Sequence, residues 1–169
     1  INNNLTYKDV KEVKVTAFAQ AYDILFDPAK YRPESRETAD HSLPFCLATA
    51  IVDKKVTTQS FAEEKLTDPA ILETIDKIKG EPSQEFEKMF PAKQPSKVVI
   101  TTNDGRAFEE YLEYPKGNPN EPMTMSDLEN KFNSLSEKVL NADRQKAAKE
   151  LIFGCESVSA RDFMQKLIV

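Results

Sequence analysis

The sequence contains a single histidine, His41, which lies between an acid, Asp40, and a hydroxyl, Ser42. An unperturbed imidazole titrates at about pH 6.5, so this side chain can take up or release a proton near neutral pH. Because consecutive residues point in different directions, the three side chains do not form a Ser-His-Asp catalytic triad. His41 is therefore a candidate acid or base by itself, and a capping or half-buried structural role is the alternative that the residues leave open.

Two basic residues are candidates for holding an anionic substrate. Arg36 lies five residues before His41, and Lys116 lies in the loop sequence "PKGNP". Arginine and lysine side chains bind carboxylates through charge-assisted hydrogen bonds. Basic residues are also common on the surface of soluble proteins, so an exposed position without a ligand is the alternative for both.

The two cysteines, Cys46 and Cys155, lie far apart in the sequence. Together with one histidine they do not supply the ligands of a zinc or an iron–sulfur site, so we expect no metal site of either kind. Both lie in apolar, helix-like contexts, which predicts buried free thiols. Free thiols are typical of a reducing compartment, and we expect a cytoplasmic protein.

The composition argues against several classes of protein. Of the 169 residues 40% are hydrophobic and 30% charged, and the formal net charge is -5. An acidic chain without a basic run is not typical of a nucleic-acid-binding protein. No apolar run approaches about 18 residues, and the start "INNNLTYKD" lacks an apolar signal core, so we expect no membrane span and no secretory peptide. The four scattered glycines form no dinucleotide-binding loop.

The first part of the chain mixes strand and helix patterns. The alternation in "DVKEVKVTAF" predicts a strand, and "AFAQAYDIL" predicts a helix. Asp40 or Ser42 can cap a buried helix that runs to about Val52. Two short helices are predicted in "VTTQSFAEEKL" and "TDPAILETIDKIK", the second with Asp68 as its cap and Pro69 at its first position. The segment "EPSQEFEKMF" is a candidate strand.

The clearest local signal is a β-hairpin. Two alternating runs in "SKVVITTNDGRAFEEYLEY" flank Asp104-Gly105, a dipeptide typical of tight turns because such turns need positive φ. We predict that residues 98–101 pair with residues 107–112 across this turn. The following segment, "YPKGNPNEPMT", has three prolines and a glycine, which predicts a loop or a linker.

The last part of the chain has helical periodicity. An apolar stripe is formed by Leu128, Phe132, Leu135 and Val139, and Ser126 with Glu129 predicts a capping box. Two further helices are predicted in "ADRQKAAKELIFG" and "SARDFMQKLIV". Because a large exposed apolar face is uncommon on a monomer, we expect a homo-oligomer.

These patterns define the fold class as α+β. We predict an antiparallel sheet with a hairpin, packed by helices, over residues 1–124, followed by C-terminal helices over residues 125–169. Runs of mixed strands and helices followed by helices alone are typical of this class.

Several of these segments together resemble the MmgE/PrpD family. The resemblance is carried by "RETADHSLP" and, at the family's separation, by "PKGNP" and "DLENKF", and it extends over most of the chain. It implies the smaller α+β lid domain of a two-domain protein whose large helical domain comes first, with last helices that return to that domain. It also implies a site in the cleft and homodimers.

The family resemblance also implies a reaction type. Its members include 2-methylcitrate dehydratase, cis-aconitate decarboxylase and iminodisuccinate epimerase, which act on small di- or tricarboxylates without a metal or an organic cofactor. Carried over by position, His41 is the acid or base, and Arg36 and Lys116 bind substrate carboxylates. The resemblance thus implies the C-terminal part of a hydro-lyase like 2-methylcitrate dehydratase.

Departures from the family pattern leave alternatives open. The chain lacks the helical domain, which supplies other residues of the family's site, so we expect this chain alone to be inactive. A family epimerase or decarboxylase is one alternative. A non-catalytic lid-domain module for binding or assembly is the other.

Overall fold

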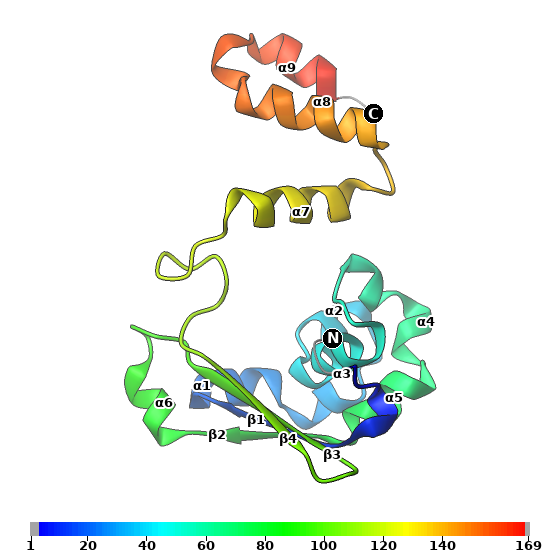
Figure 1. Cartoon of the computed structure of the whole chain (residues 1–169), viewed down its shortest axis with the longest axis vertical. Coiled ribbons are helices and arrows are strands. Elements are labelled where there is room, and N and C mark those ends of the chain that lie inside the picture. Colours follow the sequence, from blue (N-terminus) through cyan, green and yellow to red (C-terminus); the bar gives the residue numbers. More distant parts are fainter. Residues whose placement is uncertain (1–3, 168–169) are drawn as a thin grey trace. The chain divides into compact units, whose positions relative to one another are not determined.

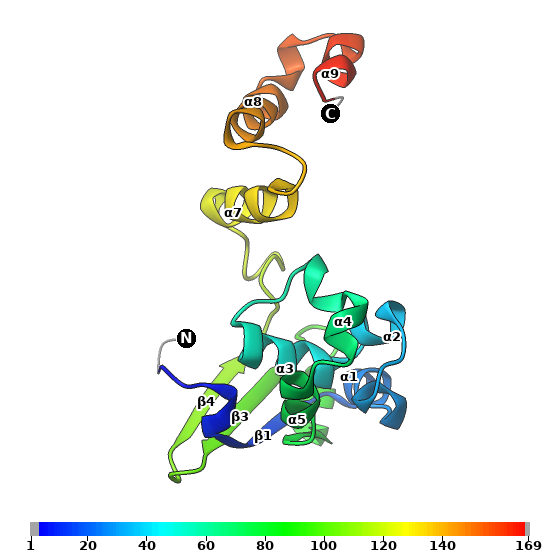
Figure 2. The same cartoon turned by 90° about the vertical axis from the view of Figure 1, so that its right-hand side faces the viewer.

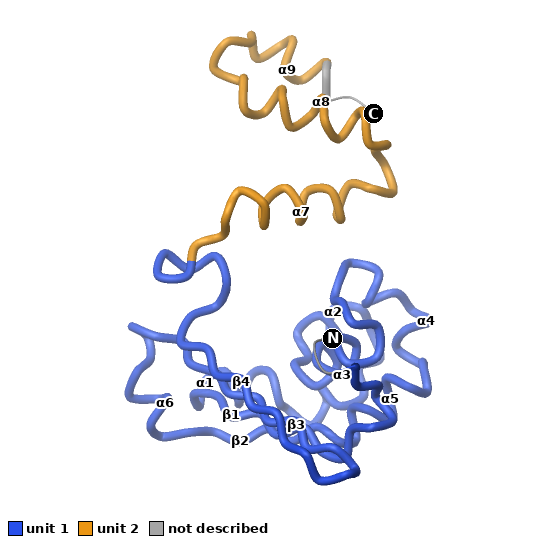
Figure 3. Tube along the Cα trace, in the orientation of Figure 1, with its two compact units in different colours: residues 1–121 blue, residues 122–169 orange. Residues whose placement is uncertain are grey.

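The computed structural model describes residues 4–167 of the chain, which is drawn in Figure 1. The chain divides into two compact units, residues 1–121 and residues 122–169 (Figure 3). Each unit has its own arrangement of elements, and the two are described separately. No helix within the described residues has the length and apolar character needed to cross a membrane.

The first unit is built on a four-stranded mixed sheet in the order β2-β1-β3-β4. Its strands are β1 (Val10–Ala17), β2 (Ile78–Pro82), β3 (Ser96–Thr102) and β4 (Ala107–Leu112). The β1–β3 and β3–β4 pairs are antiparallel, as predicted, whereas β2 runs parallel to β1. The α+β class with a helical tail is therefore confirmed, and the sheet is mostly antiparallel with β2 as its parallel strand.

The parallel strand β2 lies where the sequence predicted the end of a helix. Asp68 caps α5 (Pro69–Ile75) by accepting a hydrogen bond from the Ala70 amide at 2.9 Å. The helix ends at Ile75, and three residues later the chain enters β2, where Ile78 pairs with Val13 and is buried. Burial against β1 therefore overrides the helical spacing of Ile78.

The candidate strand "EPSQEFEKMF" is wrong, because most of it forms the helix α6 (Gln84–Met89). Ser83 begins this helix, since its hydroxyl accepts a hydrogen bond from the Phe86 amide at 3.3 Å. Phe86 is buried and Met89 is half-buried, so these two apolar side chains face the interior from a helix whose other residues are polar. A serine cap followed by good helix formers outweighs the weak alternation of the segment.

The predicted hairpin is confirmed. Val98 pairs with Glu110 and Thr101 with Ala107, and the turn between the strands contains Gly105 at a φ of 86°. Its backbone closes with a 2.9 Å hydrogen bond from the Thr102 amide to the Arg106 carbonyl. Glycine reaches this positive φ without a steric penalty, which is why the dipeptide predicted the turn.

The remaining helices of the first unit pack on the sheet or on one another, and Figure 2 shows α3 and α5 beside the sheet. They are α1 (Ala19–Leu25), α2 (Arg36–Asp40), α3 (Leu43–Asp53) and α4 (Glu63–Leu66), with short 3-10 helices at Tyr7–Asp9, Pro28–Tyr31 and Thr58–Phe61. The core combines β1, α3 and α5, and Val13, Phe45 and Ile71 are each 0% exposed. The buried helix predicted up to Val52 is α3, with Ser42 as its cap.

The second unit consists of α7 (Met125–Ser136), α8 (Ala142–Phe153), a 3-10 helix at Cys155–Ser157 and α9 (Ala160–Leu167). The capping box was predicted two residues too late. Thr124 accepts from the Asp127 amide at 3.1 Å and its own amide donates to the Asp127 carboxylate at 2.8 Å. The last predicted helix extended to residue 169, and residues 168 and 169 lie outside the described residues.

The apolar stripe predicted for the tail lies largely at the surface. Leu128, Leu135 and Val139 are 48%, 53% and 61% exposed, whereas Phe132 is half-buried. Val139 lies beyond the end of α7. The second unit therefore presents apolar side chains to solvent.

Candidate functional site

The corner between α2 and α3 is held from the inside by Ser42. This residue is 1% exposed, and its hydroxyl donates to the Lys30 carbonyl at 2.6 Å while accepting from the Phe45 amide at 3.0 Å. On the other side of the corner Ala39 is 0% exposed. The two buried residues flank Asp40 and His41, so the backbone that carries these side chains is anchored at both ends.

His41 follows α2 directly and its side chain is 70% exposed. Its Nδ1 atom lies 2.5 Å from an Asp40 carboxylate oxygen and 3.0 Å from the Glu37 carbonyl oxygen. Both neighbours favour the protonated ring. The Glu37 carbonyl in the first place, and then the Asp40 carboxylate, raise the pKa of His41 above its ordinary value, against a weaker opposing effect of burial and of Lys30.

This geometry allows acid–base chemistry at the surface. A histidine whose pKa is raised from 6.5 gains protonated population near neutral pH and remains able to exchange that proton. His41 contacts the Glu37 carbonyl at the end of α2, so its side chain also has the position of a helix cap. Its ring is exposed, which does not fit the half-buried structural histidine that the sequence left open as an alternative.

Asp40 is the member of this site that sequence reasoning missed. The rule that neighbouring side chains diverge describes Ser42, which turns into the core, but Asp40 and His41 meet. A signal in the sequence was available only for the other contact of His41. At the end of a helix, a side chain that follows the last turn can reach the carbonyl four residues back, which here is that of Glu37.

Arg36 is the first residue of α2 and is exposed. Within the described part of the chain its side chain makes no hydrogen bond or ion pair. Asp40 lies four positions after Arg36, which is the spacing of neighbours on a helix surface, whereas His41 lies one position further. The structure thus places Arg36 and His41 on the same short segment, without a contact between them.

Lys116 lies in a loop whose backbone is closed by hydrogen bonds. The Gly117 amide donates to the Glu121 carbonyl at 2.7 Å, and Gly117 has a φ of 98°, which favours glycine. The Lys116 ammonium lies 3.7 Å from the Glu121 carboxylate. This loop and α2 lie apart in both views of the chain (Figures 1 and 2).

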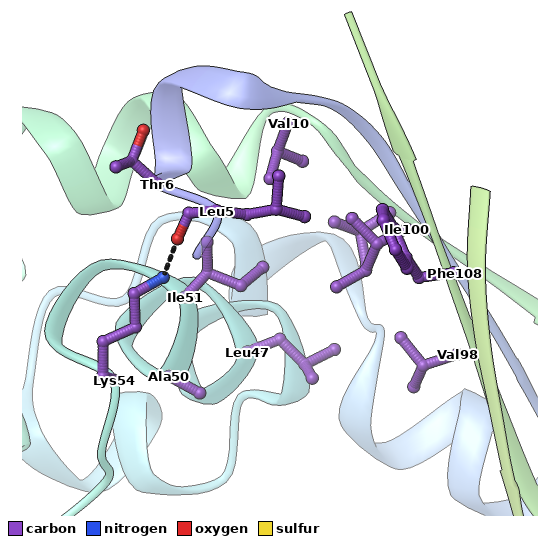
Figure 4. A pocket seen from close by; sticks show the side chains of 11 residues that line it. Leu5, Thr6, Val10, Leu47, Ala50, Ile51, Lys54, Val98, Ile100 and Phe108 are labelled. Atoms are coloured by element: carbon purple, nitrogen blue, oxygen red, sulfur yellow. Dashed lines mark hydrogen bonds between the residues drawn. The ribbon is translucent and has the colours of Figure 1, made fainter. Parts of the chain in front are cut away.

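A cavity of about 550 Å³ lies between the start of the chain, α3 and the sheet (Figure 4). It is lined by Leu5, Thr6, Val10, Val13, Leu47, Ala50, Ile51, Lys54, Val98, Ile100 and Phe108. Among the described residues that line it, Lys54 carries the one charged group, and its ammonium donates to the Leu5 carbonyl at 2.6 Å. A polycarboxylate needs several cations, so this apolar cavity is not the predicted site, and none of the three candidate residues lines it.

The thiols are arranged differently from the prediction. Cys46 is half-buried, and burial raises the pKa of its thiol, whereas Cys155 is exposed. The expectation of two buried thiols is therefore wrong for Cys155, because the second unit leaves that turn open to solvent. Among residues 4–167, no three histidine, cysteine or acidic side chains gather as metal ligands would.

Comparison with known proteins gives one family. Residues 2–154 match the family profile described as MmgE/PrpD C-terminal domain. Among curated proteins, the chain is similar to cis-aconitate decarboxylase of Mus musculus, with 28% identity over 66% of this chain and 22% of that protein. It is also similar to those of Aspergillus terreus (27% identity, 76% and 26%) and Homo sapiens (24%, 75% and 26%). The chain thus spans about a quarter of the length of these relatives.

Proposed function

We propose, from the premise that this chain belongs to the MmgE/PrpD family, that it is the C-terminal part of a lyase for small di- or tricarboxylates. The observation that carries the proposal is the exposed imidazole of His41, in contact with the Asp40 carboxylate on an anchored corner. The names of the relatives support a lyase.

In the proposed reaction, His41 acts as the acid or base and no cofactor takes part. For the dehydration of a 2-methylcitrate-like substrate, a base removes the proton next to a carboxylate and an acid protonates the departing hydroxyl. The electron pair of the C–H bond becomes the new C=C bond, and water leaves. Arg36 and Lys116 hold carboxylates and stabilise the charge that develops on them.

Decarboxylation is the second candidate reaction, because the relatives are named cis-aconitate decarboxylases. In that reaction a C–C bond breaks, carbon dioxide leaves with the carboxylate carbon, and an acid delivers a proton to the remaining carbon. Both reactions need a group that exchanges a proton with the substrate and cations that hold the remaining carboxylates, but only dehydration also needs a base. The proposal therefore names one substrate class, small di- or tricarboxylates, and two candidate reactions.

We propose that this chain supplies one part of the site and that a helical domain like that of the family supplies the rest. The loop that contains Lys116 lies apart from α2 (Figures 1 and 2), and productive catalysis needs acid, base and clamps held to about half an ångström. The 169-residue chain alone is expected to show no turnover.

Binding of the substrate class can be tested on the chain as it is. Since His41 is the only histidine, its ring signals in NMR report directly on ligands near the corner. Titration with 2-methylcitrate or cis-aconitate is expected to shift them more than acetate does at equal ionic strength. Arg36→Gln is expected to weaken the effect, and Lys11→Gln, at an exposed position on β1, serves as the control. Equal shifts with acetate would contradict the proposed substrate class.

The reaction can be tested in a chimera. Residues 1–154 replace the matching segment of the Aspergillus terreus relative, and the product is assayed for loss of water from 2-methylcitrate and release of carbon dioxide from cis-aconitate. Activity that His41→Gln abolishes supports the role of this histidine. A folded, ligand-binding chimera without either activity would favour a non-catalytic module.

Self-association through the second unit is a further part of the proposal. Leu128 and Leu135 on α7 are about half exposed, and Phe153 on α8 is 62% exposed. Burying such side chains against a second copy removes apolar surface from water. Light scattering is expected to give a mass above the 19.1 kDa of one chain, and Leu128→Glu is expected to lower it.

A further inference from the structure

The ring nitrogen Nδ1 of His41 faces two hydrogen-bond acceptors. The Asp40 carboxylate oxygen lies at 2.5 Å and the Glu37 carbonyl oxygen at 3.0 Å. A carbonyl oxygen and a carboxylate oxygen carry no proton to donate. The hydrogen in this arrangement therefore belongs to Nδ1, which donates to both oxygens. In the neutral ring the other nitrogen, Nε2, then has a free lone pair.

The surrounding backbone keeps this arrangement in place. The Glu37 carbonyl belongs to α2, and Ala39 and Ser42 on either side of the pair are buried. The ring itself is 70% exposed and the Asp40 side chain 39% exposed, so solvent reaches the part of the ring that the two acceptors leave open. Of the charges in the described part of the chain, Asp40 favours the imidazolium, and Lys30 opposes it more weakly.

We propose that Asp40 is a positioning residue that holds His41 in the tautomer with its proton on Nδ1, so that Nε2 is the atom that exchanges protons with a substrate. Isolated imidazole side chains distribute their proton between both nitrogens, and the hydrogen bond at one nitrogen decides which is used. The assignment of the tautomer follows from the contacts alone. Its use on a substrate rests on the proposed function.

The tautomer defines the proton path in the proposed reaction. The substrate proton moves to Nε2 and the electron pair of the C–H bond stays on the substrate, which gives an imidazolium with both nitrogens protonated. The Asp40 carboxylate stabilises this cation through the Nδ1 hydrogen bond. The Nε2 proton then passes to the departing hydroxyl, which leaves as water, and His41 returns to its starting state.

NMR of the 169-residue chain tests the tautomer directly. With a single histidine, long-range correlations between the ring protons and the ring nitrogens need no assignment between residues. Above the pKa of His41 we expect a protonated-type signal for Nδ1 and an unprotonated-type signal for Nε2. A neutral ring with its proton on Nε2, or an equal mixture of tautomers, would overturn the proposal.

Substitution of Asp40 tests its part. Asp40→Ala is expected to lower the pKa of His41 and to increase the share of the Nε2–H tautomer, and Asp40→Asn is expected to lower the pKa while its amide oxygen keeps part of the preference. Glu34→Gln removes an exposed acid from the same segment and is expected to change neither readout. Far-UV circular dichroism checks that each variant is folded. An unchanged His41 pKa and tautomer in folded Asp40→Ala would overturn the role of Asp40.

The outcome is independent of the substrate test. If the Nδ1–H tautomer and its dependence on Asp40 are observed but tricarboxylates do not shift the ring signals more than acetate, the proposed function fails and the assignment of Asp40 stands. If the ligands shift the signals but the tautomer is the other one, the function stands and the assignment of Asp40 fails.

Discussion

Replacing Ser42 by alanine should destabilise the corner that carries the candidate site. The serine hydroxyl both caps α3, by accepting from the Phe45 amide, and donates to the Lys30 carbonyl across the corner. Alanine removes both hydrogen bonds at a position that is 1% exposed, so water does not easily replace them. The substitution therefore leaves a donor and an acceptor without partners.

The expected magnitude follows from these two losses. Removing a serine N-cap costs about 1 kcal/mol, and leaving a partly buried carbonyl without its partner costs about 1–2 kcal/mol. We expect the free energy of unfolding to fall by about 2–3 kcal/mol, which lowers the equilibrium constant for folding roughly 30- to 150-fold. The His41 ring should also lose its fixed environment, because Ser42 anchors the adjacent backbone.

Urea unfolding followed by far-UV circular dichroism measures this change. Ser35→Ala is the matched control, because Ser35 caps α2 by accepting from the Thr38 amide at 3.2 Å but is exposed. The control should cost only about 0.5 kcal/mol, the low end for a cap. Equal losses in the two variants would refute the reasoning that burial of the Ser42 hydroxyl determines its contribution.

Three further predictions follow from single contacts. Gly80→Ala should lower the free energy of unfolding in urea by about 1–3 kcal/mol, because a Cβ atom there would lie 2.6 Å from the Phe26 ring. Adding Phe26→Leu should restore part of this loss. An unchanged urea midpoint in Gly80→Ala would contradict the clash. The stabilisation from protonated His41 is fully present below pH 6.5 and is lost as the pH rises through its raised folded pKa. The difference in unfolding free energy between wild type and His41→Gln should therefore shrink with rising pH. A difference that stays constant with pH would contradict this prediction. Cys155 should react with a thiol reagent faster than half-buried Cys46, and Cys155→Ser should remove the fast phase; two equal rates would contradict this.

Local interactions are what the sequence by itself determined. The hairpin followed from Asp104-Gly105, because only a few residues adopt the positive φ that its turn requires. The start of α5 followed from Asp68 and Pro69, since a capping side chain and a proline at the first helical position act within one turn. His41 was identified because its type is unique in the chain, although its role stays a prediction.

Only the tertiary structure decided which of several locally possible conformations a segment adopts. Ile78 continues the helical spacing of α5, but it pairs with Val13, 65 residues earlier in the chain, as part of a parallel strand. Ser42 likewise turns into the core beside the Asp40–His41 contact and donates to the Lys30 carbonyl, 12 residues earlier in the chain. Pairing and burial of this kind depend on residues far away in the sequence, and their free energy exceeds the small differences in local propensity that a sequence pattern reports.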